Sequence, residues 1–274
     1  MNWPIFLLFL CMALCFIIRM PISLSMLSAS IVYLLIARPT DLGETYTVIT
    51  GNTFSNYTML AAPLFIFMAN IMNESEVTDK MFSFCNGLLG RLKGGTAQVN
   101  VLISLIFSGM TGSAIADASG IGTMEIKQMK SEGYDPEFSC AITAASATIG
   151  PIFPPSIPMI IYAMLSGASI GKLFMGGVIP GVLLALVLAV YVGFISYKRN
   201  YPAGVVMTKK EFGIATVKAL PALLTVVILL GGIYTGVCTP TEAGAVASAY
   251  AILISTFIYR TMGPKKLWGV IKKS

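Results

Sequence analysis

Two stretches of the sequence combine helix-breaking residues with oxygen donors, and together they could bind a cation. The segment ATIGPIFPPSIPM, residues 147–159, places four prolines and a glycine inside an apolar part of the chain. Each proline in a helix interior costs about 3 kcal/mol and frees a carbonyl, which in lipid must be buried in protein or line a wet cavity. The segment SGMTGS, residues 108–113, adds the hydroxyls of Ser108, Thr111 and Ser113. Because hard cations such as sodium prefer oxygen ligands, the two stretches are suited to binding one.

Both stretches also have a purely structural interpretation. Small residues such as those of SGMTGS let membrane helices pack closely, and the sequence leaves this alternative open. A simple kink needs one proline, whereas the other stretch contains Pro151, Pro154, Pro155 and Pro158. We therefore interpret that stretch as a functional interruption of a helix.

Two acids follow the SGMTGS segment. Asp117 and Glu125 are eight residues apart, which places them roughly on one helical face. A carboxylate deep in a membrane is a functional candidate by default, but a structural role in which the Asp117 carboxylate accepts hydrogen bonds that hold the turn is equally open. Glu125 lies close in sequence to Lys127, Lys130 and Glu132, and we expect it at a wet cytoplasmic helix end.

The composition is that of a membrane protein. Hydrophobic residues make up 56% of the chain, charged residues make up 11%, and the mean hydropathy is +0.82. A soluble domain carries about 25% charged residues. The chain has no histidine, which removes the usual base of a catalytic triad and the commonest metal ligand. The net charge of +6 comes from basic residues at segment ends rather than from an aromatic-interleaved patch, which argues against nucleic-acid binding.

The uncharged run from Gly94 to Ala116 could cross a bilayer, which needs about 20 residues, but the distribution of charge favours a hairpin. If the run crosses, the cationic pairs Lys198–Arg199 and Lys209–Lys210 fall on the outer side, against the positive-inside rule. If it turns back at GMTGS, every Lys and Arg except Arg38 and Lys172 lies on the cytoplasmic side. We therefore predict a re-entrant hairpin.

The next uncharged run, from Glu137 to Lys172, is too long for one straight helix in a hydrocarbon core of about 30 Å. A broken crossing, with half-helices on either side of the prolines, fits better. We therefore divide the chain into residues 1–74 (three membrane helices forming a scaffold), 75–93 (an amphipathic cytoplasmic arm helix), 94–168 (a transport element made of the hairpin 94–133 and the broken helix 136–166), 169–199 (a long membrane helix), 200–218 (a cytoplasmic connector) and 219–274 (two further helices and a basic cytoplasmic tail).

Three long stretches resemble a known family. They are GMTGSAIADASGIGTM (109–124), ATIGPIFPPSIPMIIYAMLSGASIGKLFMGGVIPG (147–181) and GVCTPTEAGAVASAYAILI (236–254), and the similarity continues in order over essentially the whole chain. In these residues the chain resembles the large membrane (M) subunit of tripartite ATP-independent periplasmic (TRAP) transporters. The resemblance implies an all-α integral membrane protein with an inverted-repeat, ion-transporter-like elevator fold, in which each repeat holds a re-entrant helical hairpin and a broken helix.

The resemblance also implies a function and a site. It suggests a secondary transporter, not an enzyme, that uses sodium to import a carboxylated solute such as a sialic acid or a dicarboxylate. Carried over residue by residue, the coupling ion Na⁺ would bind, mostly through backbone carbonyls, to Ser108, Thr111, Gly150, Phe153 and Pro154. We expect the substrate to contact the tip of the hairpin at Gly112, Ser113 and Asp117.

The implied partners are a small four-helix membrane (Q) subunit, a periplasmic substrate-binding (P) protein, the organic-acid substrate and membrane lipid. The implied location is the bacterial inner membrane, which the chain would cross several times. From the charge pattern we expect the N-terminus in the periplasm and Ser274 in the cytoplasm. The sequence does not name the solute.

One departure from the family pattern affects the functional expectation. Family members contain two inverted repeats, and this sequence stops after the two opening helices of the second, so that repeat is expected to be incomplete. A truncated or split subunit that acts only as a membrane scaffold is therefore the alternative to transport. An intramembrane enzyme is the other rival, and the absence of histidine and of a GxGD pattern around Asp117 argues against it.

Overall fold

The chain folds into two compact units, Met1–Asn56 and Tyr57–Ser274. The structure, a computed structural model, describes residues 3–37, 39–41, 43–44, 47, 51, 60–75, 77–204 and 207–274, apart from the side chains of residues 109–111, 116 and 273. Every regular element in the described residues is a helix, and one isolated β-bridge joins two loops. The expected all-α class is confirmed for this part of the chain.

The first unit contains two apolar helices that pack against each other. They are α1 (Trp3–Ile17) and α2 (Ile22–Ala37), and a short 3₁₀ turn, η1 (Pro39–Asp41), follows them. Ser25 and Ala29 of α2 are buried, whereas most large apolar side chains of both helices face outward. A bilayer stabilises such an exterior and water does not.

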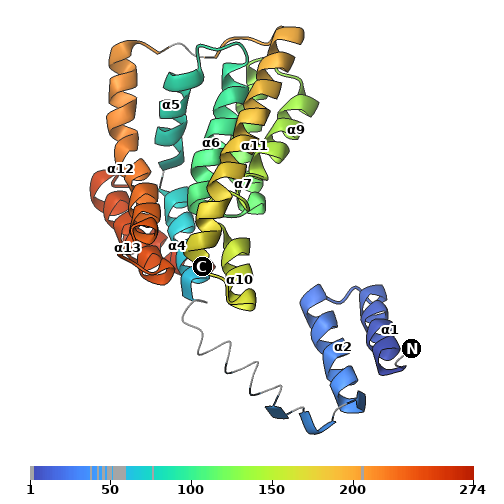
Figure 1. Ribbon diagram of the computed structural model, residues 1–274. Helices are drawn as coiled ribbons and strands as arrows, with labels where there is room; N and C mark the ends of the chain where they lie inside the picture. The colour runs from blue at the N-terminus through green and yellow to red at the C-terminus, as the bar shows by residue number, and fades with distance from the viewer. Residues whose placement is uncertain are drawn as a thin grey trace. The chain divides into compact units, whose positions relative to one another are not determined.

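The second unit is a helical bundle (Figure 1). Its elements are α4 (Ala61–Glu74), α5 (Val77–Leu89), α6 (Gly95–Thr111), α7 (Ala114–Ser119), α8 (Ile121–Ser131), α9 (Pro136–Ala147), α10 (Ile157–Ser166), α11 (Ile170–Lys198), α12 (Lys209–Tyr234), α13 (Pro240–Leu253), the π-helical turn η3 (Ile254–Ile258) and α14 (Pro264–Lys273).

Capping residues determine where two of these helices begin. Thr208 and Glu211 form a capping box, in which each side chain bonds the backbone N–H of the other residue. As a result α12 begins at Lys209, inside residues 200–218, which we expected to form a connector throughout. The same arrangement at Thr239 starts α13.

Within the described residues, three helices are long and apolar enough to cross a membrane: α11, α12 and the continuous stretch Pro240–Ile258. Four others are apolar but shorter, namely Trp3–Ile17, Ile22–Ala37, Gly95–Ser108 and Ile157–Ser166. Their outer faces are apolar as well, and Val190 in the middle of α11 is 73% exposed. Length, composition and outer surface are therefore those of a membrane protein.

Two apolar clusters hold the second unit together. The larger involves α4, α5, α6 and α13, where Phe65, Met72 and Phe107 are almost fully buried. The smaller involves α6, α8, α9 and α11, where Val101 and Val192 are almost fully buried. Because α6 contributes to both clusters, its position is fixed from two sides.

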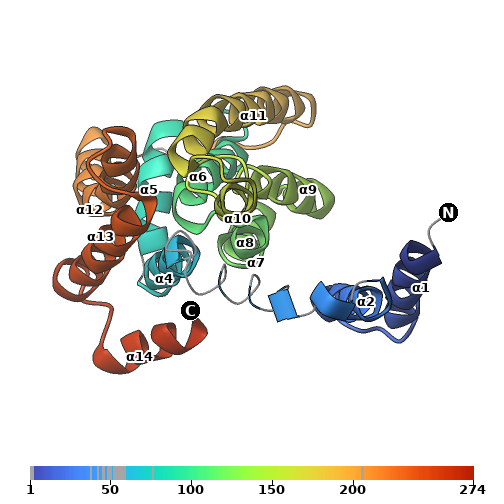
Figure 2. The ribbon, with the colours of Figure 1, turned by 60° about the horizontal axis from the view of Figure 1, so that its bottom comes forward.

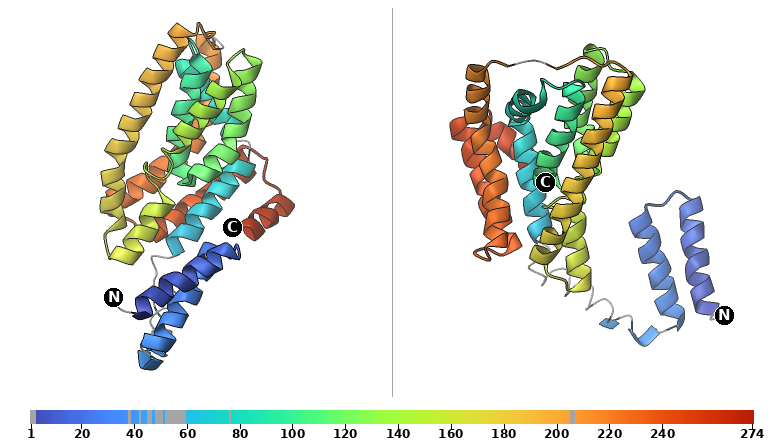
Figure 3. Two further views of the ribbon diagram at one scale, coloured as in Figure 1. Left: turned by 90° about the vertical axis from the view of Figure 1, so that its right-hand side faces the viewer. Right: turned by 45° about the horizontal axis from the view of Figure 1, so that its top comes forward.

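Both ends of the α6–α8 hairpin lie beside the chain that follows α11 (Figure 3). Before α6, Lys93 pairs with Ala203 in the isolated β-bridge. After α8, the Tyr134 hydroxyl donates to the Pro202 carbonyl at 3.4 Å. The hairpin therefore starts and finishes at the same end of the second unit.

An ion pair at this end predicts that stability depends on pH. The Tyr201 hydroxyl and the Arg199 guanidinium both donate to Oδ2 of Asp135 at 2.5 Å. The Tyr201 hydroxyl first, and then Arg199, hold the pKa of Asp135 below its usual range. Such a carboxylate stabilises the folded state above the unfolded pKa of about 3.9, and this contribution is lost as the pH falls through the folded pKa.

Asp135→Asn should therefore lower the melting temperature at pH 7 by a small amount, because the pair is half exposed and screened. The difference from the unmodified protein should shrink below about pH 4. Glu137→Gln, in the exposed first turn of the same helix, is the matched control and should change little at either pH. A deficit for Asp135→Asn that stayed constant down to about pH 3 would contradict this account.

Candidate functional site

The hairpin reverses at a glycine. α6 ends at Thr111, and Gly112 follows with a φ of +58°, donating its N–H to the Ser108 carbonyl at 3.1 Å. This left-handed conformation is open to glycine and costs other residues about 1 kcal/mol or more. α7 starts at Ala114, and α8 then runs back along α6.

The tip of the hairpin lies directly on the segment that joins α9 to α10 (Figure 2). A Cβ atom on Gly112 would lie 2.7 Å from the Pro155 carbonyl oxygen and 2.9 Å from the Ile157 nitrogen. The two backbones are therefore in contact with no side chain between them.

The joining segment is a true interruption of helix. α9 ends at Ala147, α10 begins at Ile157, and the peptide bond between Pro154 and Pro155 is cis. Ser156 caps α10, because its hydroxyl accepts from the Met159 N–H at 3.3 Å and donates to the Pro151 carbonyl at 2.6 Å. The cap directs the chain into the second half-helix.

Three carbonyls of the interruption could accept a ligand. Among the described groups, which leave out the side chains of residues 109–111 and 116, no hydrogen bond reaches the carbonyl oxygens of Gly150, Phe153 or Pro154, whereas those of Ile149 and Pro151 are used. Buried or lipid-facing carbonyls without partners are costly. These three belong to the residues that the sequence comparison assigned to sodium.

The remaining predicted sodium ligands lie on α6. Ser108 is fully buried, and its hydroxyl donates to the Leu105 carbonyl at 2.6 Å, which leaves the oxygen lone pairs for another partner. Thr111 is the last residue of α6, and its side chain lies outside the described ones.

The side chain of Phe153 packs against α11. A Cβ atom on Gly181 of α11 would lie 2.8 Å from the Phe153 Cβ, and the ring joins the smaller apolar cluster. Its carbonyl is therefore the group that Phe153 has available for an ion.

The predicted substrate residues gather at the same place. A Cβ atom on Gly150 would lie 3.0 Å from Oδ2 of Asp117 and 3.3 Å from the Ser113 carbonyl carbon. Asp117 is 5% exposed in α7, and Gly112 is buried against Pro155. The structure thus brings the tip and the interruption together, although they are far apart in the sequence.

A buried polar network that the sequence analysis missed ties the hairpin to α9. The Asn100 amide donates to Oε2 of Glu125 at 2.7 Å and to the Thr143 hydroxyl at 2.8 Å. The Ser146 hydroxyl donates to the Asn100 carbonyl oxygen at 2.8 Å, and Ser104 donates to Ser146 at 3.0 Å. Hydrogen bonds in a water-free interior fix the register of the helices that they join.

The expectation for Glu125 is wrong. It is 2% exposed, rather than at a wet helix end, because Ile121, Gly122 and Met129 lie on the same buried face of α8. Its sequence neighbours Lys127 and Lys130 are on the opposite, exposed face.

A signal for the network was present in the sequence. Thr96, Asn100, Ser104 and Ser108 recur at every fourth position of α6, which aligns them along one face, and all four are buried. Read as a polar stripe, this spacing predicts a neighbouring helix with matching polar groups.

Comparison with known proteins identifies the family. Residues 9–273 match the family described as tripartite ATP-independent periplasmic transporter, DctM component. The sialic acid TRAP transporter large permease protein SiaM of Vibrio cholerae is 38% identical over 93% of this chain and 60% of its own length. The sialic acid TRAP transporter permease protein SiaT of Haemophilus influenzae is 39% identical over 92% of this chain and 41% of its length.

A third relative, the C4-dicarboxylate TRAP transporter large permease protein DctM of Vibrio cholerae, is 36% identical over 90% of this chain and 55% of its length. The chain thus spans about half of the length of the curated relatives that it matches. These relatives are named permeases, not enzymes, and the apolar helices agree with a membrane location. The chain belongs to the DctM component family, the large permeases of tripartite ATP-independent periplasmic transporters.

Proposed function

We propose that this chain is part of a sodium-coupled permease that imports a carboxylated organic solute. The observation that carries the proposal is the contact between the hairpin tip and the helix interruption, where the Gly150, Phe153 and Pro154 carbonyls have no hydrogen-bond partner in the described residues. The printed names of the relatives, which include sialic acid and C4-dicarboxylate transporters, support an acid as the solute.

The residues present fit a sodium ion. Every group that the family resemblance assigns to the ion can offer an oxygen: the three carbonyls and the hydroxyls of Ser108 and Thr111. Placing carbonyls and helix ends around an ion in the interior of a membrane protein replaces the ion's water shell. When bound, sodium would supply positive charge beside the hairpin tip.

The tip residues would then hold the solute. Backbone N–H groups of the tip other than that of Gly112, which bonds the Ser108 carbonyl, would donate to an anionic solute. The Asp117 carboxylate cannot pair with the carboxylate of a solute, so it would accept hydrogen bonds from neutral solute groups. Solute specificity would therefore depend on side chains around the tip.

Several further features belong to this proposal. The hairpin would be re-entrant from the cytoplasmic side, since both of its ends lie beside residues 199–203 and their cationic neighbours. The N-terminus would be periplasmic and Ser274 cytoplasmic in a bacterial inner membrane. Transport would follow an elevator-type alternation of access, with solute delivered by a periplasmic binding protein and a small four-helix subunit completing the complex.

Sodium-dependent thermal stabilisation tests the ion site. In detergent, sodium should raise the melting temperature of the protein relative to choline, and potassium should not replace it. Ser108→Ala should require about tenfold more sodium for the same shift, because one ligand is lost. Ser119→Ala, which removes a hydroxyl of similar local bonding from an exposed position of α7, is the matched control and should retain the full response.

The alternative, in which the chain is only a membrane scaffold, predicts that sodium does not stabilise the protein. If the protein acts only in assembly, sodium and choline will give equal melting temperatures. That result, or a full sodium response in Ser108→Ala, would refute the proposed site. All of the proposed ligands lie in the second unit of this chain.

A further inference from the structure

Glu125 of α8 is a carboxyl group inside the second unit, and one of its oxygens is unused. The residue is 2% exposed, and its Oε2 accepts from the Asn100 amide at 2.7 Å. Oε1 is enclosed and has no hydrogen-bond partner in the part of the chain that the structure describes. An ionised carboxylate in a protein interior needs a cation or several hydrogen bonds, because it has lost its water. One amide does not replace that water.

Among the described residues, no positive charge faces Glu125 from the helices packed around it. α6 contains no charged residue. Glu137 of α9 and Asp79 of α5 lie in exposed first turns. Lys127 and Lys130 of α8 itself are on its exposed face. Charged side chains therefore do not neutralise a carboxylate at this position.

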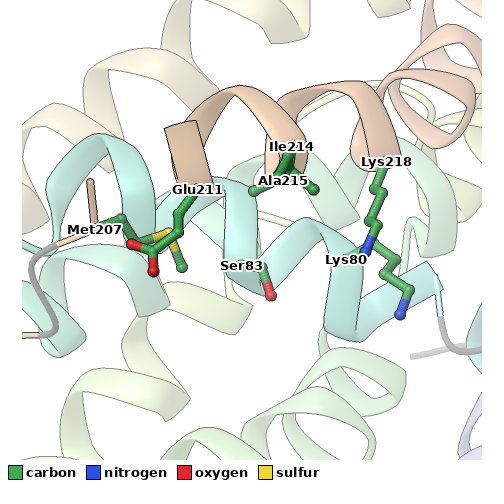
Figure 4. Close-up of a pocket in the computed structure, with 7 residues that line it drawn as sticks. All are labelled: Lys80, Ser83, Met207, Glu211, Ile214, Ala215 and Lys218. Atoms are coloured by element: carbon green, nitrogen blue, oxygen red, sulfur yellow. The ribbon is translucent and has the colours of Figure 1, made fainter. Parts of the chain in front are cut away.

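The titratable groups that do face Glu125 cannot be positive. α7 presents Asp117 and α5 presents the thiol of Cys85, and both interact electrostatically with the Glu125 carboxyl. The lysine of α5, Lys80, lines a pocket against α12 instead, where Figure 4 shows it beside Lys218. The surroundings of Glu125 thus disfavour a negative charge.

The hydrogen-bond network around Glu125 contains unmatched hydrogens. With the Asn100 amide donating to Glu125 and Thr143, the Ser146 hydroxyl lies 2.8 Å from the Asn100 carbonyl oxygen and 3.1 Å from the Thr143 carbonyl. A hydroxyl has one hydrogen, so it can serve only one of these acceptors fully. The hydroxyl hydrogen of Thr143 has no acceptor among the described groups.

Turning the Asn100 amide over matches these groups. Its oxygen then faces Glu125 and Thr143, and its nitrogen faces Ser146, at unchanged distances. Thr143 donates to the amide oxygen, the amide nitrogen donates to Ser146, and Ser146 donates to the Thr143 carbonyl. Two oxygens then lie 2.7 Å apart, on Glu125 and Asn100, and they need a hydrogen between them.

We propose that Glu125 is a proton-binding site and is an uncharged acid at neutral pH while the hairpin is packed against α9. Binding takes one proton from water and forms one O–H bond at Oε2, which donates to the turned Asn100 amide. Because Glu125 is enclosed by α6, α8 and α9, the proton is exchanged only when these helices separate. Closure of the hairpin is thereby linked to the proton concentration.

Glu125→Gln tests the site, since glutamine is a permanently uncharged copy of the acid. In the unfolded chain Glu ionises above about pH 4.3, whereas the folded protein keeps the proton. The stability from Glu125 is therefore present at low pH and is lost as the pH rises. For each pH unit between about pH 5 and 7, the unfolding equilibrium constant of the unmodified protein should rise about tenfold relative to that of Glu125→Gln.

Glu137→Gln is the matched control for these measurements, which use denaturant unfolding in detergent. It neutralises an exposed carboxylate of the neighbouring helix, and its unfolding equilibrium constant should keep a fixed ratio to that of the unmodified protein over the same pH range. A pH-independent ratio for Glu125→Gln, or the same pH-dependent ratio for Glu137→Gln, would overturn the proposal.

Infrared difference spectroscopy detects the proton directly and does not depend on stability. The spectrum of the unmodified protein minus that of Glu125→Gln, at neutral pH, should contain the carbonyl stretch of a protonated carboxyl group, and the difference with Glu137→Gln should lack it. If the band is absent and potassium stabilises the unmodified protein more than Glu125→Gln, a metal cation replaces the proton and the proposal fails. Unfolding and spectra are otherwise measured in choline, so this failure would leave the proposed sodium site standing.

Discussion

Gly112→Ala is expected to lower the melting temperature of the protein strongly and to abolish its response to sodium. The new Cβ would lie 2.7 Å from the Pro155 carbonyl oxygen and 2.9 Å from the Ile157 nitrogen. Both are backbone atoms that cannot rotate away, so the hairpin tip and the interruption would have to separate. The left-handed φ adds strain for any residue other than glycine. We therefore expect the free energy of unfolding to fall by about 3 kcal/mol.

Gly167→Ala is the control that isolates the conformational part of this loss. Gly167 has a similar φ of +71° at the end of α10, and no atom lies within 4 Å of the position of its Cβ. Gly167→Ala should lower the free energy of unfolding by about 1 kcal/mol and leave the sodium response intact. Equal losses in the two variants, measured by thermal unfolding in the same detergent, would mean that the backbone contact contributes nothing.

Asn100→Ala is expected to have the second large effect and to lower the free energy of unfolding by about 3 kcal/mol. It removes one amide that bonds the Glu125 carboxyl group, the Thr143 hydroxyl and the Ser146 hydroxyl, and it leaves those groups buried with fewer partners. Because the network connects α6 to α8 and α9, the variant should also weaken sodium-dependent stabilisation. Thermal unfolding with and without sodium measures both effects.

A double-mutant cycle separates the network from ordinary packing. The double variant Asn100→Ala/Glu125→Ala should lose clearly less free energy of unfolding than the two single variants lose together, since the two residues share one hydrogen bond. Glu125→Gln keeps an acceptor oxygen for Asn100 and should be milder than Glu125→Ala. Strict additivity in the cycle would contradict the coupling that we assign to this pair.

Local chemistry made several features accessible from the sequence. Proline cannot donate a hydrogen bond in a helix, so the break between α9 and α10 could be placed from Pro151, Pro154 and Pro155 alone. The all-helical class followed from long apolar runs. The start of α12 was missed, since the polar composition before Lys218 concealed the capping box at Thr208.

Glu125 shows why other features could not be predicted from the sequence. Its sequence neighbours Lys127 and Lys130 suggest a solvated turn, whereas the helical period places Glu125 on the opposite face with Met129. Which face is buried depends on α6 and α9, which pack against α8 only in the folded protein. Similarly, the family resemblance placed the hairpin tip and the interruption at one ion site, but the direct backbone contact between Gly112 and Pro155 joins residues that are distant in the sequence, and the sequence contains no signal for that contact.

The contact at Gly112 has an evolutionary consequence. It is made by main-chain atoms on both sides, so the contact itself involves no side-chain atom of either segment. We therefore expect neighbouring positions such as Ser113 to vary among transporters of different solutes. Residue 112 should accept only glycine. Diversification would then change cargo while the coupling apparatus stayed the same.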